Sequence, residues 1–256
     1  MELKPEETDL LTDYLDHYAS LIGDKRTQKA FQGTIKGIIA AESLVCARIA
    51  THSPELAAGK NSEQRIRRMV GVGKQKTTKR SSLDADHLCA KLQERALEQL
   101  QDEEEVWVMD DGCDLRKPYA RRMEGLMRVK KLDGEGLTNG YRTLNAIGIG
   151  KKRRGMLYQR LFSSQEADFV SEPYEVQRML HSVIKATQSL KAKIIHAMDS
   201  GFDDVAVWST IWEAGQQLVC RLCHPDRLVE RQTSDGRWET VSLSQAASGL
   251  QELAEV

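Results

Sequence analysis

The sequence predicts an all-helical N-terminal region, residues 1–104, followed by an α/β domain over residues 105–256. Two observations lead to this division. Through most of the first hundred residues, apolar side chains recur at the three- and four-residue spacing of amphipathic helices. After residue 105, short apolar or β-branched runs alternate with one strongly amphipathic helical segment, which is the pattern of mixed α/β domains.

In the N-terminal region the periodicity predicts helices over residues 6–22, 29–50 and about 84–101. Residues 60–80 interrupt the pattern with two glycines and a Thr-Thr-Lys-Arg-Ser-Ser run, and we expect a loop there. The expected order is therefore helix, helix, basic loop, helix.

In the second region the first strand is expected at the run that starts with Val106 and ends at the aspartates Asp110 and Asp111. A hairpin follows, with strands at 140–149 and 156–164 and a basic turn between them. Ser171 is a candidate cap and Pro173 lies in the first turn of the amphipathic helix that comes next. A strand ending at Asp199, a helix around residues 205–212 and a strand at 217–222 complete the order.

Two aspartates each end a short apolar run that is typical of a buried strand. Asp111 follows Val106-Trp107-Val108-Met109-Asp110, and Asp199 follows Ile194-Ile195-His196-Ala197-Met198. A glycine or small residue comes directly after each, so we expect both aspartates at strand ends. Carboxylates at the ends of neighbouring strands suit Mg²⁺, which binds through one or two protein carboxylates together with substrate phosphates.

The two blocks resemble those of the DDE transposases of bacterial insertion sequences, in the cut-and-paste, IS-four-like group. In that family one block has the pattern Asp-x-Ser-Asp-Ile-x-Lys-Pro-Tyr-Ala and the other Asp-Arg-Gly-Phe-Asp. Here they are Asp111-Gly112-Cys113-Asp114-Leu115-Arg116-Lys117-Pro118-Tyr119-Ala120 and Asp199-Ser200-Gly201-Phe202-Asp203. The segment 139–148 also looks like the strand that follows the first aspartate in the family, so the resemblance spans about residues 105–225.

The resemblance implies a ribonuclease H-like fold for residues 105–256, and the order three strands, helix, strand, helix agrees with it. It also implies that Asp111 and Asp199 are catalytic ligands of Mg²⁺, with Mn²⁺ as a substitute. Two-metal phosphoryl transfer requires such carboxylates to converge from distant parts of the chain. Asp110 is the competing first ligand, and the alignment of Lys117-Pro118-Tyr119-Ala120 favours Asp111. The alternative role for both is capping at strand ends.

The third acidic residue of the family's site has no counterpart in this sequence. The family places a glutamate on a later helix within Tyr-x-x-Arg-x-x-x-Glu, but this chain has no tyrosine after Tyr174. The later glutamates lie in no such setting: Glu213, Glu230, Glu239, Glu252 and Glu255. We therefore expect a chain truncated before the glutamate helix, with an incomplete catalytic domain.

Basic residues are clustered locally although 37 basic and 38 acidic residues nearly balance overall. Residues 60–80 contain eight basic residues against one acid, Glu63, and form a candidate phosphate-binding segment whose alternative is a solvated loop. Lys117 and the hairpin tip are further candidates. The complete set of expected DNA-binding residues is Lys60, Arg65, Arg67, Arg68, Lys74, Lys76, Lys79, Arg80, Lys117, Lys151, Lys152, Arg153 and Arg154.

Other classes of protein are less compatible with the sequence. No apolar stretch is long enough to span a bilayer and the N-terminus lacks signal-peptide order, so a cytoplasmic protein is expected. Five cysteines, an odd number, favour reduced thiols. Cys220-Arg221-Leu222-Cys223-His224 matches a haem attachment pattern only formally, and a zinc site lacks a second cysteine pair.

The resemblance, together with the local basic segments, implies a cut-and-paste DNA transposase that binds double-stranded transposon ends and target DNA, as a homodimer on DNA. Magnesium-dependent strand cleavage and transfer are expected to be weakened or lost through the missing glutamate. The alternative is a non-catalytic DNA-binding or dimerising regulator of a complete transposase.

Overall fold

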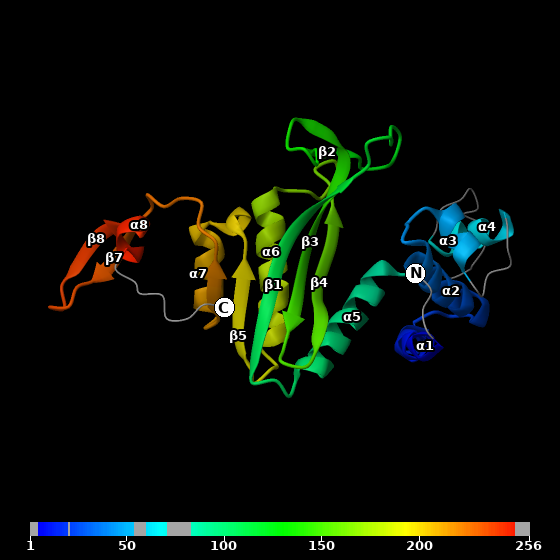
Figure 1. Cartoon of the computed structure of the whole chain (residues 1–256), viewed down its shortest axis with the longest axis horizontal. Coiled ribbons are helices and arrows are strands. Elements are labelled where there is room, and N and C mark those ends of the chain that lie inside the picture. Colours follow the sequence, from blue (N-terminus) through cyan, green and yellow to red (C-terminus); the bar gives the residue numbers. More distant parts are fainter. Residues whose placement is uncertain (1–4, 20, 54–59, 71–82, 249–256) are drawn as a thin grey trace. The chain divides into compact units, whose positions relative to one another are not determined.

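A computed structural model describes residues 5–19, 21–53, 60–70 and 83–248 of the chain (Figure 1). The chain divides into two compact units, Met1–Lys91 and Leu92–Val256, and each is described by itself. The division falls within one helix, α5 (Ala85–Leu100), rather than after residue 104. None of the described helices is long and apolar enough to cross a membrane.

The described part of the first unit is helical. It contains α1 (Pro5–Ala19), α2 (Lys25–Ala41), α3 (Cys46–His52) and α4 (Lys60–Met69). Asp24 caps α2 by accepting hydrogen bonds from the backbone N–H groups of Arg26 and Thr27. The buried apolar side chains are Leu15, Tyr18, Ile22, Ala30, Phe31, Ile49, Ala50, Ile66 and Met69.

Two sequence predictions for this unit are wrong. Residues 29–50 do not form one helix, because Glu42 adopts a left-handed conformation with φ of 47° and ends α2 there. Residues 60–69 are not a loop but the helix α4, whose buried residues Ser62, Ile66 and Met69 recur at helical spacing. The many charges of this segment had obscured that short apolar stripe.

The second unit is built on a mixed sheet. Its strands are β1 (Glu105–Arg116), β2 (Met127–Lys130), β3 (Leu137–Ile149), β4 (Arg154–Phe162), β5 (Lys193–Met198) and β6 (Gln217–Cys220). The strand order is β4-β3-β1-β5-β6; β3 is antiparallel to β4 and to β1, whereas β1, β5 and β6 are parallel. Strand β2 pairs with the first residues of β3.

The predicted hairpin, the helix capped by Ser171 and the strand before Asp199 are confirmed. The helix is α6 (Glu172–Thr187), and Ser171 accepts a hydrogen bond from the Tyr174 N–H. It is followed by β5, by a 3₁₀ turn η1 (Ser200–Phe202) and by α7 (Val205–Glu213). Strand β1 is longer than expected, so Asp111 lies within the strand instead of at its end.

One face of the sheet is covered by helices and the other is open. Figure 1 shows α6 running along one side of β1, β3 and β4. The core on that side joins strand residues Val106, Val108, Leu144 and Leu157 to residues of α5, α6 and α7. On the opposite face Trp107, Met109 and Val219 are 38%, 43% and 54% exposed. The open face is therefore where β1 presents side chains to solvent.

A small two-stranded sheet ends the described chain. It pairs β7 (Leu228–Gln232) with β8 (Trp238–Ser242), and the short helix α8 (Leu243–Ala247) follows with a capping box at Ser242.

The close approach of α5 to the sheet depends on a glycine. A Cβ atom at Gly155 would lie 2.5 Å from the Cβ of Ala96 in α5, too close for any real contact. We therefore expect Gly155→Ala to lower the free energy of unfolding by about 1–3 kcal/mol, the usual cost of overpacking. Urea denaturation measures this change.

The matched control is Gly112→Ala in β1, where a Cβ atom would lie 3.5 Å from Leu144 Cδ2, an ordinary contact. Equal losses for the two variants would show that α5 does not pack at Gly155 as described.

Candidate carboxylate site on the open face

The two consecutive aspartates of β1 point to opposite faces of the sheet, because successive side chains of a strand alternate. Asp110 is 3% exposed and lies on the helix-covered face with Val106 and Val108, whereas Asp111 is exposed on the open face. Only Asp111 can therefore bind a solvent-borne ion without disturbing the core.

Asp111 lies on β1, and Asp199 comes directly after β5, the parallel strand next to it. The register pairs Asp110 with Met198, so the next position along each chain is Asp111 on β1 and Asp199 directly after β5. Neighbouring strands are about 4.8 Å apart, so the backbone at Asp111 lies close to the backbone at Asp199.

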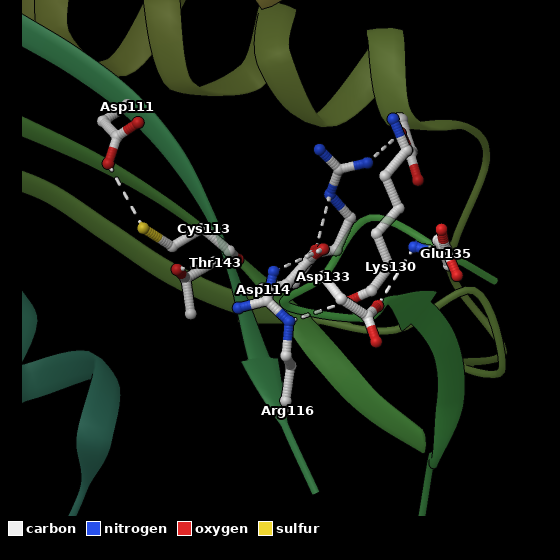
Figure 2. A network of polar contacts seen from close by, with 10 residues as sticks. Asp111, Cys113, Asp114, Arg116, Lys130, Asp133, Glu135 and Thr143 are labelled. Atoms are coloured by element: carbon white, nitrogen blue, oxygen red, sulfur yellow. Dashed lines mark hydrogen bonds and ion pairs between the residues drawn. The ribbon is translucent and has the colours of Figure 1, made fainter. Parts of the chain in front are cut away.

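Neither carboxylate is bound to a basic side chain in the described structure. Asp111 Oδ2 accepts a hydrogen bond from the Cys113 thiol at 3.2 Å, and this carboxylate raises the pKa of the thiol (Figure 2). Asp199 Oδ1 accepts the Gly201 N–H at 2.9 Å and so caps η1, the alternative role considered from sequence. Both keep oxygen lone pairs for another ligand.

Two polar side chains on the same face were missed by the sequence analysis. Asn145 on β3 pairs directly with Asp111 on β1, and Thr143 pairs with Cys113. Asn145 Nδ2 donates to Thr143 Oγ1 at 3.3 Å. Their alternation along residues 137–149 was visible in the sequence, but the register that sets them beside Asp111 was not.

Asp110 makes a buried contact with β5 instead. Its Oδ2 atom lies 2.6 Å from His196 Nδ1, and both side chains are fully buried. His196 Nε2 lies 2.8 Å from Gln216 Oε1, while Gln216 Nε2 donates to Thr187 Oγ1 at 2.9 Å. Both ring nitrogens of His196 therefore lie within hydrogen-bond distance of a side-chain oxygen.

Burial raises the pKa of Asp110, and the hydrogen bond and charge of His196 oppose that rise in part. The chain Asp110–His196–Gln216–Thr187 ties together β1, β5, the segment before β6 and α6.

Asp203 holds the loop that follows Asp199. Its Oδ2 atom accepts the N–H groups of Cys223 and His224 at 2.7 and 3.0 Å, and its Oδ1 atom lies 2.7 Å from Arg227 Nη1. Loss of water around Asp203 opposes its ionisation, but these donors and the Arg227 charge outweigh it and lower the pKa of Asp203.

Within the described ranges, the one group of three or more potential metal-ligating side chains is Asp203, Cys223 and His224. The Asp203 oxygens in this group already accept backbone N–H groups and face Arg227. Cys223 and His224 lie beyond β6, which ends at Cys220 rather than at residue 222. No third carboxylate among the described residues joins Asp111 and Asp199 in such a group.

The expected DNA-binding residues that the structure describes lie on α4 in the first unit, and at the β3–β4 hairpin and just beyond β1 in the second. Arg65, Arg67 and Arg68 lie on α4, where Arg67 forms an ion pair with Glu63 at 2.8 Å. Lys60 begins that helix, but its side chain, like Lys74, Lys76, Lys79 and Arg80, lies outside the described residues.

Lys151, Lys152, Arg153 and Arg154 lie at the β3–β4 hairpin, next to the start of β1. The backbone N–H groups of Lys151 and Lys152 donate to the Glu103 carboxylate, so an acidic segment adjoins the tip. Lys117 lies beyond the opposite end of β1.

Asp114, a fixed point of the first motif, has a structural role. It lies 3.9 Å from Arg116 and 3.7 Å from Arg142, and Arg142 also contacts Glu172 at 2.6 Å, at the start of α6 (Figure 2). This network ties the end of β1 to β3 and α6.

We expect Asp110→Ala to lower the free energy of unfolding by about 3–5 kcal/mol, because it leaves the buried His196 without its partner. Asp111→Ala, one residue away on the open face, should change stability by no more than about 0.5 kcal/mol. Chemical denaturation of both variants tests the assignment of faces, and a reversed order of losses would refute it.

The lowered pKa of Asp203 predicts a pH dependence of stability. Its contribution is fully present above the unfolded-state pKa of about 3.9 and is lost as the pH falls through the lower folded-state pKa. Asp203→Asn should therefore be less stable at pH 7 and lose less stability between pH 5 and pH 3 than the unsubstituted chain. Asp226→Asn, an exposed neighbour, serves as the control, and urea denaturation at each pH provides the measurement.

No family model matches the chain, and no curated protein matches it. Among solved structures, it is similar to the Mos1 strand transfer complex, with 13% identity, 88% of this chain and 80% of that chain covered, and a TM-score of 0.27. A pre-cleavage Mos1 transpososome aligns at 13% identity over 87% of this chain and 61% of that chain, with a TM-score of 0.26.

The Mos1 transposase paired-end complex with left transposon end aligns at 14% identity over 85% of this chain and 59% of that chain, also with a TM-score of 0.26. All three neighbours are Mos1 transposase complexes, but likeness at this level adds no argument to the geometry of the site.

Proposed function

We propose that the chain is a DNA transposase of the DDE type whose Asp111 and Asp199 bind Mg²⁺ for phosphoryl transfer on DNA. The observation that supports this most directly is their register: Asp111 on β1 and Asp199 directly after the adjacent parallel strand β5 are both exposed, and Asp111 lies on the open face of the sheet. The strand order β4-β3-β1-β5-β6, with α6 joining β4 to β5, supports a ribonuclease H-like classification of the second unit.

The chemistry that the bound ions would supply is activation of an attacking hydroxyl and stabilisation of the leaving oxygen. The residues of this chain would perform the remaining tasks. Asp111 and Asp199 would hold the ions, and Asn145, opposite Asp111, is placed to donate a hydrogen bond to a phosphate oxygen. The Asp110–His196 contact would hold β1 and β5 in the register that the ligands need.

The alternative is a DNA-binding protein without strand transfer, which would compete with a complete transposase. It is favoured by one specific observation, the lack of a third carboxylate near Asp111 and Asp199 among the described residues. The two proposals differ in whether the protein cleaves DNA.

We expect the protein to nick a supercoiled plasmid that carries the element's own ends when Mg²⁺ or Mn²⁺ is present. Asp111→Ala and Asp199→Ala should each lower the nicking rate at least about a hundredfold, because each removes a metal ligand. Glu230→Ala, an exposed carboxylate on β7, is the control and should retain activity. End-specific binding without nicking would instead support the non-catalytic alternative. Nicking that both aspartate variants retain would exclude the proposed site.

A further inference from the structure

A second basic segment, which the sequence analysis did not recognise, adjoins the carboxylate site. Residues 116–131 contain seven basic residues against one acid, Glu124, a local charge of +6 over 16 residues. The following turn adds Asp133 and Glu135, which leaves +4 over residues 116–136. We call residues 116–131 the basic arm.

The basic arm is folded against β3 by specific hydrogen bonds. Arg116 Nε donates to the Lys130 carbonyl at 2.7 Å (Figure 2). Arg128 donates to Asn139 Oδ1 and to the Leu137 carbonyl, both at 2.9 Å. Asn139 Nδ2 donates to the Ala120 carbonyl at 2.7 Å. Two arginines and Asn139 thus fix the path of the arm.

Tyr141 adds a further contact, since its hydroxyl donates to the Glu124 carbonyl at 2.6 Å. The arm therefore has a defined position relative to β3 before any ligand binds, which lowers the entropic cost of binding.

The other five basic side chains of the arm form no hydrogen bond or ion pair with another described residue. Arg121, Arg122, Lys130 and Lys131 are exposed, and Lys117 is partly exposed. Cations that are held on a fixed backbone, yet not neutralised by nearby acids, are suited to bind a polyanion.

The register places part of the arm on the same face as Asp111. In β3, Asn145 pairs with Asp111 of β1, Asn139 with Arg128 of β2, and Leu137 with Lys130 of β2. These three β3 residues are an even number of positions apart, so they and their partners share one face of the pleated sheet. By this alternation Arg128 and Lys130 have the same strand parity as Asp111.

The separation fits a DNA duplex. From Asn145 to Asn139 and Leu137, β3 advances roughly 20 and 27 Å at about 3.4 Å per residue, which is about six to eight base-pair steps along a duplex. A duplex that places a phosphate at Asp111 and runs along β1 and β3 would reach the arm within one helical turn.

We propose that the basic arm binds the phosphate backbone of double-stranded DNA about six to eight base pairs from the phosphate held at Asp111 and Asp199. This inference rests on the proposed function for the identity of the substrate. It adds Arg121, Arg122, Lys130 and Lys131 to the residues proposed to contact DNA. It also implies that the duplex runs along β1 and β3.

The test is the salt dependence of binding to a fluorescein-labelled random-sequence 30-base-pair duplex, measured by anisotropy from 50 to 300 mM KCl with the full chain. Phosphate contacts do not depend on sequence, so the element's own ends are not needed. The variants are Arg121→Ala/Arg122→Ala and Lys130→Ala/Lys131→Ala. The control is Lys185→Ala/Lys191→Ala, which removes two exposed charges from the same unit, one of them on α6 across the sheet.

Each arm variant should weaken binding roughly tenfold or more at 100 mM KCl and make the slope of log K against log [KCl] shallower by about 1–2. The control should stay close to the unsubstituted chain. Arg121→Lys/Arg122→Lys keeps the charge and should largely restore the slope, which separates a lost phosphate contact from a folding defect.

If the protein binds the duplex but both arm variants keep the unsubstituted slope of log K against log [KCl], the basic arm does not contact phosphates. That result would leave the proposed function unaffected. An unsubstituted chain with no salt-dependent affinity for DNA would overturn both.

Discussion

The contact between Asp110 and His196 sets the geometry on which the rest of the second unit depends. It joins β1 to β5 with a 2.6 Å hydrogen bond inside the core, where an unpaired charge or polar group is costly. A shift of β5 by one residue would turn His196 to the open face and leave Asp110 without a partner. The correct register therefore has a specific stabilising interaction, and that register also sets Asp199 beside Asp111.

Asp110 and Asp111 have different roles because successive side chains of β1 point to opposite faces of the sheet. Asp110 stabilises the sheet from the covered side, while Asp111 remains available on the open side. Beyond β5, Asp203 fixes the turn that begins at Asp199, through two backbone N–H groups and Arg227. The proposed ligands are thus positioned by buried neighbours one and four residues away in the sequence, and they need no basic partner of their own.

The sequence predicted the order of the main strands and helices in the second unit, because its apolar runs are short and their ends are marked by residues that interrupt regular structure. Gly150 and Gly155 flank the hairpin turn, and Pro173 lies in the first turn of α6. It also predicted that Asp111 and Asp199 lie on adjacent strands. It did not predict that β1 continues past Asp111, because a glycine such as Gly112 often marks the end of a strand. In the structure β1 continues through Gly112, where a Cβ atom would make only an ordinary contact with Leu144.

Pairing register could not be obtained from one sequence, so Asn145 and the basic arm were missed. Residues 116–131 overlap the first aspartate motif, and their charges become a surface only when Asn139 and Arg128 fold the arm onto β3. In the first unit, α4 was taken for a loop because a stripe of two apolar residues is a weak signal among so many charges.

The proposed function depends on a divalent ion bound by Asp111 and Asp199 together. Iron-mediated cleavage tests it most directly: Fe²⁺ bound in place of Mg²⁺ is oxidised to Fe³⁺ by added hydrogen peroxide, which is reduced to hydroxide and a hydroxyl radical, and the radical cuts the protein backbone near the metal. We expect cuts next to both Asp111 and Asp199, which excess Mg²⁺ suppresses and which either aspartate-to-alanine variant abolishes at both positions. Cuts confined to the region of Asp203, Cys223 and His224, or no cuts near β1, would contradict it.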